Sequence, residues 1–154
     1  GVETFGFAGM ILNESPEAFE KAVGDLTGQL DVRGNQLING FDVCIEAVGL
    51  PSTFQNCVDA AAFGGKVVLI GVGKKNLDFN FTLLQKKELN VFGSRNALKK
   101  DFVELIDLVR SGKADLEKII TNLYPFQDAA KAFADFDQNG TQMLKVMIDF
   151  TAQG

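Results

Sequence analysis

The chain has no histidine and no tryptophan, and it has two cysteines among its 154 residues. Without histidine it cannot supply a Ser-His-Asp or Cys-His catalytic pair, nor a zinc site with a histidine ligand. Cys44 and Cys57 have no CxxC neighbour. We therefore interpret both cysteines as small apolar residues of a protein that stays in a reducing compartment.

Positive charge and long apolar runs are also scarce. The net charge is −5 and no basic cluster is present, which argues against nucleic acid or an anionic membrane as a partner. No apolar run approaches the roughly 20 residues that span a bilayer, and the N-terminus shows no signal-peptide pattern. A composition of 46% hydrophobic and 23% charged residues is typical of a soluble globular domain. The expected location is the cytoplasm.

A strand-helix-strand pattern runs from Gly40 to Gly73. A mostly apolar strand is predicted at Phe41–Ala47, and residues 50–63 form a helix that starts near Ser52. Gly64 and Gly65 then turn into "KVVLIGV", a continuous apolar run typical of a strand buried in a parallel sheet. Alternating strands and helices predict right-handed crossovers and an α/β fold.

Further elements are predicted on both sides of this pattern. Ser15 as a cap and Pro16 as the first residue predict a helix that ends at Gly28. The other predicted elements are the end of a helix at 1–8, a strand at Met10–Leu12, a surface loop at 29–39, a strand at 89–94, an amphipathic helix closed by Gly112, a strand at Ile119–Asn122, a helix after Pro125 and a strand at 141–150. The 14 phenylalanines are interpreted mainly as core residues.

Five stretches together resemble the C-terminal half of a medium-chain, zinc-type alcohol or polyol dehydrogenase. They are "FDVCIEAVG", "GGKVVLIGVG", "LNVFGSRNA", "LIDLVRSGKADLEKIITNLYPFQDAAKAF" and "LKVMIDF". Their order and spacing are similar to the family from about Phe5 to Phe150, and "GSRNA" is closer to the polyol, sorbitol-like or sugar-acid branch. The resemblance implies a partial Rossmann fold in residues 1–112, a doubly wound, mostly parallel sheet with helices on both faces. Residues 113–154 would be the segment that returns toward the catalytic domain.

The resemblance also implies what lies outside this sequence. In the family, an N-terminal domain carries the catalytic zinc and its ligands, and the G-x-G-x-x-G turn and a ribose-binding acid follow. None of these is found here, so we expect a fragment that is inactive, binds cofactor weakly and contributes no catalytic residue and no zinc ligand. It would supply strands 3 to 6 of the sheet without strands 1 and 2, which leaves the strand at Phe41–Ala47 with an open edge.

Candidate binding residues lie where the parallel strands end, because ligands of open α/β sheets bind there. By resemblance, the first strand-end loop lies near the adenosine ribose, and the next two lie along the nicotinamide, whose carboxamide is bonded by backbone groups. The cofactor-binding candidates are Ala47, Val48, Gly49, Ile70, Gly71, Val72, Gly93, Ser94 and Lys145, with Lys145 against the pyrophosphate. The resemblance also places Arg95 and Asn96 beside the substrate, where an arginine could bind a hydroxyl, carboxylate or phosphate group through two N–H bonds. Glu46 is not assigned to the ribose, because its strand is the fourth.

The resemblance implies an NAD- or NADP-dependent, zinc-type dehydrogenase that oxidises a secondary alcohol of a polyol or sugar acid. It also implies a homodimer or homotetramer through the edge strand near Leu89–Phe92. Two other hypotheses stay open: a non-catalytic α/β module for assembly, and a zinc-free, quinone-reductase-like relative. Each candidate also has a plainer interpretation, with the glycines as strand-end turns and Arg95 and Lys145 as solvated side chains.

Overall fold

The computed structural model describes residues 9–151. They divide into two compact units, residues 9–96 and residues 97–151. The first unit contains α1 (Pro16–Thr27), β1 (Gln29–Val32), β2 (Asn35–Ile38), β3 (Phe41–Glu46), α2 (Pro51–Ala60), β4 (Ala61–Leu69), α3 (Thr82–Lys87) and β5 (Asn90–Gly93). The second contains α4 (Lys99–Arg110), β6 (Ile120–Pro125), α5 (Ala129–Asn139) and β7 (Lys145–Asp149). The helix end predicted at 1–8 lies outside the described residues, and no helix within them is long and apolar enough to cross a membrane.

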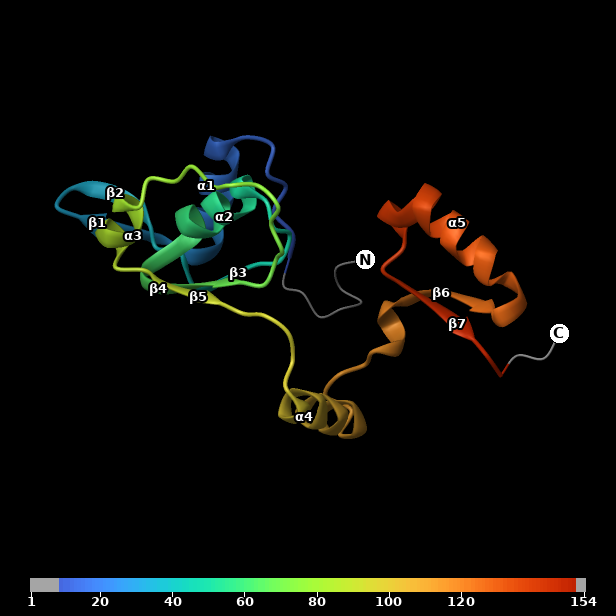
Figure 1. The fold of residues 1–154 in the computed structure, drawn as a ribbon. Coiled ribbons are helices and arrows are strands. Elements are labelled where there is room, and N and C mark those ends of the chain that lie inside the picture. Colours follow the sequence, from blue (N-terminus) through green and yellow to red (C-terminus); the bar gives the residue numbers. More distant parts are fainter. Residues whose placement is uncertain (1–8, 152–154) are drawn as a thin grey trace. The chain divides into compact units, whose positions relative to one another are not determined.

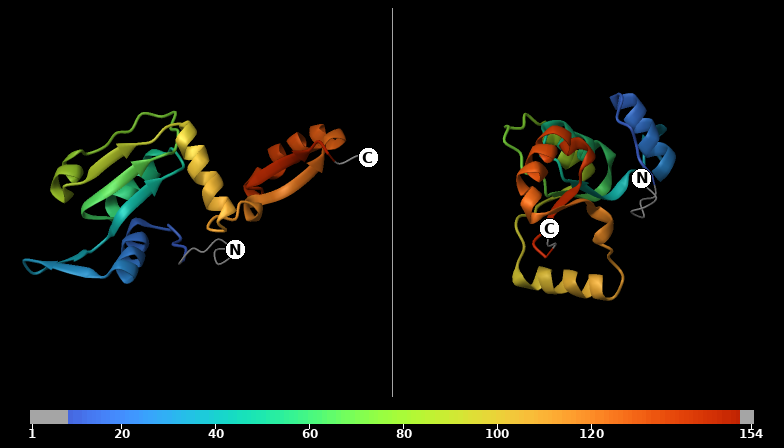
Figure 2. Two further views of the ribbon diagram at one scale, coloured as in Figure 1. Left: turned by 90° about the horizontal axis from the view of Figure 1, so that it is seen from below. Right: turned by 90° about the vertical axis from the view of Figure 1, so that its right-hand side faces the viewer.

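The first unit is built on a parallel sheet in the order β3-β4-β5 (Figures 1 and 2). Ile45, Val68 and Phe92 are partners in one row across the three strands, so their side chains share a face. Cys44 and Val67 are partners on the opposite face. The sequence prediction of an α/β fold with a parallel sheet is confirmed.

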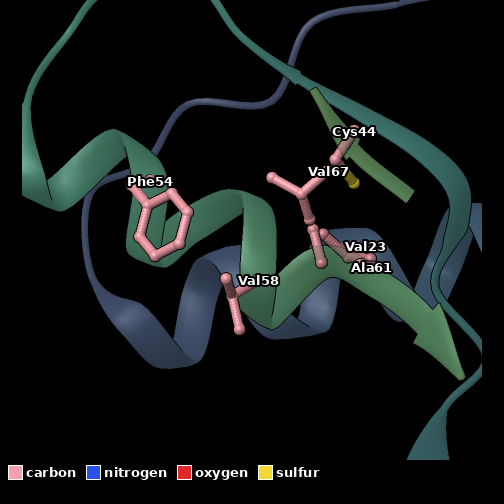
Figure 3. Packing of buried hydrophobic residues seen from close by; sticks show 7 residues of the cluster. Val23, Cys44, Phe54, Val58, Ala61 and Val67 are labelled. Atoms are coloured by element: carbon pink, nitrogen blue, oxygen red, sulfur yellow. The ribbon is translucent and has the colours of Figure 1, made fainter. Parts of the chain in front are cut away.

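One face of this sheet carries the core. Val23 of α1 and Val58 of α2 are fully buried, together with Val67 of β4. The same cluster contains Cys44, Phe54, Ala60 and Ala61 (Figure 3). α1 and α2 lie on the same side of the sheet (Figure 1). The opposite face is open, since Ile45 is 58% exposed and Phe92 is 48% exposed.

The prediction for the phenylalanines is wrong for most of them. Among the phenylalanines of residues 9–151, Phe54 alone is buried. It packs edge-on against the ring of Phe79, with 4.9 Å between centroids. Most of the others lie on apolar surfaces that the same unit does not cover, such as Phe92 on the open sheet face and Phe133, 73% exposed, on α5.

Helix ends marked by local signals are where the sequence predicted them. The Ser15 Oγ accepts a hydrogen bond from the Ala18 N–H at 3.1 Å, and Gly28 closes α1 with φ of +84°. α4 is followed by Gly112 with φ of +71°. The next residue, Lys113, donates its N–H to the carbonyl oxygen of Leu108 at 2.9 Å, which closes the helix as expected.

Two predictions before β3 are wrong. Residues 29–38 are not a loop but an antiparallel hairpin of β1 and β2. Arg33 and Gly34 both have positive φ, as a two-residue hairpin turn requires, and the Asp31 carboxylate accepts from the Gly34 N–H at 2.8 Å. Met10–Leu12 is not a strand, because no neighbouring strand in the described chain pairs with it. The open edge expected on β3 is confirmed within residues 9–151, since β3 pairs only with β4 there.

The predicted boundary between helix and strand before "KVVLIGV" is also wrong. α2 ends at Ala60 and β4 begins at Ala61, so Gly64 and Gly65 lie inside the strand. Phe41 pairs with Ala61 but Val43 pairs with Lys66, which makes residues 62–65 a bulge. The strand ends at Leu69 rather than continuing to Val72.

The end of α2 is held by a residue that lies far away in the sequence. The half-buried Lys87 Nζ of α3 donates to the carbonyl oxygens of Val58, Asp59 and Ala61 at 3.0, 2.7 and 3.0 Å. A cation placed on the last carbonyls of a helix satisfies them and interacts favourably with the helix dipole.

The second unit pairs β6 and β7 in parallel, with α5 between them in the chain. The strand predicted at Ile119–Asn122 is found at Ile120–Pro125, so it starts one residue later and ends three residues later than predicted. The helix predicted after Pro125 is confirmed, and the closing strand is shorter than expected. The predicted functional division after residue 112 stays a prediction.

Candidate functional site

Three parallel strands end side by side in the first unit. Glu46, Leu69 and Gly93 end β3, β4 and β5, and they are partners in one row. The residues that follow each strand therefore lie at the same edge of the sheet. The structure brings most of the predicted cofactor-binding residues to this edge, namely Ala47, Val48, Gly49, Ile70, Gly71, Val72, Gly93 and Ser94.

The first two strand-end loops, residues 47–49 and 70–73, touch through their main chains. The Glu46 carbonyl oxygen accepts from the N–H of Ile70 at 2.8 Å and of Gly71 at 3.0 Å. A Cβ added to Gly49 would lie 2.6 Å from the Val72 carbonyl carbon, and Gly49 has φ of +87°. A Cβ on Gly71 would overlap the backbone nitrogen of Gly49. Glycine is therefore required at both positions for the loops to approach so closely.

The Glu46 side chain organises the first loop. It is 4% exposed, and its Oε1 accepts from the N–H of Val48 at 2.9 Å, the N–H of Gly49 at 2.7 Å and the Thr53 hydroxyl at 2.6 Å. The Thr53 hydroxyl, followed by the backbone N–H groups, holds the pKa of this carboxyl below its usual range, although burial acts in the opposite direction.

Sequence reasoning excluded Glu46 as a ribose ligand but missed its role in the loop. Its inward-facing Oε1 is consistent with that exclusion. The available signal was an acid at a strand end, with a glycine three residues later and a threonine near the start of the next helix.

The third strand end is more open. The Ser94 N–H donates to the Leu69 carbonyl oxygen at 2.9 Å, which joins this end to β4. A Cβ on Gly93 would have no atom within 4 Å. Arg95 and Asn96, the predicted substrate-side residues, follow at once and are exposed, and Asn96 has φ of +60°.

Lys145 is the first residue of β7 in the other unit, where it is exposed. It lines an open apolar hollow of about 300 Å³ with residues of α5 and β7. Its predicted contact with the cofactor pyrophosphate stays a prediction.

The carboxyl end of the sheet offers exposed backbone that a flat amide group could approach. A carboxamide offers N–H donors and one carbonyl acceptor, and backbone groups can bind both. Val72, Gly73, Gly93 and Ser94 are all exposed. Since no side chain crowds Gly93, a ring could approach the backbone there.

The edge does not fit a zinc ion. In residues 9–151 no group of three or more histidine, cysteine, aspartate or glutamate side chains is placed to hold a metal. Cys44 and Cys57 are free, and burial raises the pKa of both thiols, that of Cys57 to about 11. Such thiols are poor sources of the thiolate that zinc binds, so we derive no step through a metal.

Known sequences match most of this chain. The sequence pattern of a family described as zinc-binding dehydrogenase matches residues 2–111. The chain is 33% identical over 106 residues to the L-galactonate-5-dehydrogenase of Escherichia coli K12, which covers 69% of this chain and 31% of that protein. It is 30% identical over 141 residues to the L-arabinitol 4-dehydrogenase of Aureobasidium melanogenum, which covers 91% of this chain and 35% of the relative. The chain thus spans about a third of the length of these curated relatives.

Solved structures show the same fold. Zinc-dependent alcohol dehydrogenase 2 from Streptococcus pneumonia, in its apo form, superimposes with a TM-score of 0.79 at 28% identity, covering 99% of this chain and 41% of that one. An alcohol dehydrogenase of Escherichia coli CFT073, solved with NADH bound, gives a TM-score of 0.66 at 29% identity and covers 72% of this chain and 33% of its own. The partial Rossmann-like fold is therefore shared with larger enzymes.

Proposed function

Because this chain belongs to the zinc-binding dehydrogenase family, we propose that it is part of an NAD(P)-dependent, zinc-type dehydrogenase that oxidises a secondary alcohol of a polyol or sugar acid. The convergence of three strand-end loops at one edge of the β3-β4-β5 sheet is the observation that carries the proposal. The named activities of its relatives toward L-galactonate, L-arabinitol and D-xylulose support the substrate class.

In this proposal the chain binds and orients the cofactor. The nicotinamide, when bound, accepts the hydride that leaves the alcohol carbon. Residues 47–49 lie near the adenosine ribose, and the backbone of residues 70–72 and 93–94 bonds the carboxamide. Arg95 and Asn96 hold substrate oxygens, for which a guanidinium can donate two parallel N–H bonds. Lys145 contacts the pyrophosphate.

The other properties of the whole protein are proposals too. Zinc ligands and catalytic groups would come from sequence beyond these residues, so the 154-residue chain would be inactive alone. Residues 1–112 would form the nucleotide-binding part and residues 113–154 the returning segment. The protein would be cytoplasmic and would form a homodimer or homotetramer through β5. This strand lies at an edge of the described sheet, which is consistent with such pairing.

Cofactor binding can be tested on the chain itself. Nuclear magnetic resonance suits the weak binding expected, since it reports millimolar affinities residue by residue. Titrating the ¹⁵N-labelled chain with NADH, and separately with NADPH, should shift the amide signals of residues 47–49, 70–72 and 93–94. The signals of Arg33 and Gly34 in the hairpin turn should stay in place. Shifts confined to the hairpin, or none at all, would contradict the binding site.

Activity should be measured on the longest protein that contains this chain. It should oxidise L-arabinitol or L-galactonate with NAD or NADP and should lose that activity when a chelator removes the metal. Oxidation of primary alcohols alone would reject the substrate class. Full activity after metal removal would instead favour the zinc-free, quinone-reductase-like hypothesis.

A second candidate function, a non-catalytic module for assembly, is favoured by the open sheet face. Val43 and Ile45 are 51% and 58% exposed on β3. Such a module should associate without any cofactor, whereas a dehydrogenase should show the amide shifts described above.

A further inference from the structure

Glu46 is the one charged residue that is buried in the described part of the chain. A buried carboxylate is costly unless hydrogen bonds replace its water. Here the Oε1 atom accepts three bonds from Val48, Gly49 and Thr53, all between 2.6 and 2.9 Å. The proposed function gives this residue no part in the chemistry, so its retention in the interior needs another explanation.

Glu46 is also the point where two loops meet. Its side chain holds the N–H groups of Val48 and Gly49, while its own carbonyl oxygen holds those of Ile70 and Gly71. A Cβ on Gly71 would overlap the Glu46 carboxylate, so the second loop lies directly against that group. One residue therefore bonds to both loops.

Thr53 connects this arrangement to α2. Leu50 precedes the helix, and its apolar side chain cannot accept a capping hydrogen bond. The Thr53 hydroxyl accepts from the Leu50 N–H at 3.3 Å and donates to the Glu46 Oε1 at 2.6 Å. A threonine at the third helical position thus links the helix start to the carboxylate through one oxygen.

We propose that Glu46, braced by Thr53, is a positioning residue that holds loops 47–49 and 70–73 against each other in one arrangement. That these loops then present their backbone to a nicotinamide cofactor rests on the function proposed above. Removing the charge or its brace should let the two loops rearrange together, because the first loop is bonded to this carboxylate and Gly71 of the second loop lies directly against it.

The test compares four variants of the 154-residue chain with the wild type. Glu46→Gln removes the charge and Thr53→Val removes the hydroxyl. Thr53→Ser keeps the hydroxyl and removes only the methyl group. Val23→Ala is the matched control. Val23 is fully buried in α1, and its side chain has no polar atom that could bond to either loop. The measurements are the ¹⁵N amide spectrum, the melting temperature and the Kd for NADH.

Glu46→Gln and Thr53→Val should shift the amides of both loops and weaken NADH binding roughly tenfold. Thr53→Ser should keep the wild-type spectrum and affinity. Val23→Ala should lower the melting temperature and leave the loop amides in place. Should Glu46→Gln fail to fold, Thr53→Val supplies the same comparison without an altered buried charge.

The positioning role is wrong if both Glu46→Gln and Thr53→Val leave the Gly71 amide unchanged. It is also wrong if Val23→Ala disturbs both loops as much at an equal loss of melting temperature. A wild-type chain that shows no NADH-dependent shifts would reject the proposed cofactor site. In that case, joint displacement of both loops in Glu46→Gln would still support the positioning role.

Discussion

The buried carboxylate of Glu46 makes the stability of the first unit depend on pH. Its pKa in the folded chain lies below its ordinary value of about 4.3. Folding therefore gains stability from this group above that ordinary value and loses the gain as the pH falls through the lowered folded pKa. Urea unfolding at pH 7 and at pH 3 should show that the stability difference between the wild type and Glu46→Gln shrinks in acid. A difference independent of pH would contradict the ionised carboxylate.

Gly71 and Gly93 form a matched pair of strand-end glycines. A Cβ on Gly71 would overlap the main chain of Gly49, whereas a Cβ on Gly93 would meet open space. Because backbone atoms cannot move aside cheaply, Gly71→Ala should cost about 2–4 kcal/mol of unfolding free energy. Gly93→Ala should stay within about 0.5 kcal/mol of the wild type. Denaturant midpoints of the two variants would settle this, and equal midpoints would show that the loops separate easily.

At the scale of helices and strands, the elements whose start or end is marked by neighbouring capping residues were predictable from sequence. Ser15 and Pro16 mark the start of α1, and Gly112 marks the end of α4, because capping depends on neighbouring residues. The hairpin at residues 29–38 was missed because its strands are only four residues long and mainly exposed, so the alternation in Gln29–Val32 is too short to stand out and Asn35–Ile38 does not alternate.

Elements that depend on distant residues were not predictable. The end of α2 depends on Lys87, which lies far along the chain. The segment Met10–Leu12 has a strand-like sequence, but a strand also needs a partner. The same limit applies to the site. The positions of its strand-end loops could be predicted from the order of the strands. The bonds of Glu46 to two loops could be seen only in the structure.

Lys87 gives a test at this scale. Its Nζ bonds three carbonyl oxygens at the end of α2, so Lys87→Met should cost about 1–3 kcal/mol and should speed hydrogen exchange near Ala61. The neighbouring Lys86 is exposed, so Lys86→Met should change neither quantity. Equal exchange rates in the two variants would show that the α2 end needs no cap.

At the scale of the whole molecule, the described sheet has two edge strands, β3 and β5. Ile45 on β3 and Phe92 on β5 are both exposed on the open face, so a lysine at either position puts a charge beside one edge. Because exposed apolar edges promote association, we expect the 154-residue chain to sediment as a dimer or larger species. Phe92→Lys should reduce association if β5 pairs between copies, and Ile45→Lys should reduce it if β3 does.

Sedimentation velocity of the wild type and both variants checks this prediction. A wild-type chain that stays monomeric at high concentration would contradict association through either edge. It would also count against the assembly-module function, which depends on contact between proteins.

The contact between loops 47–49 and 70–73 has a mechanical consequence. Main-chain atoms of the two loops touch, and no side chain lies between them that could change its rotamer to make room. Neither loop can move toward the other unless the other gives way. A ligand that pushes one loop toward the other would therefore displace both.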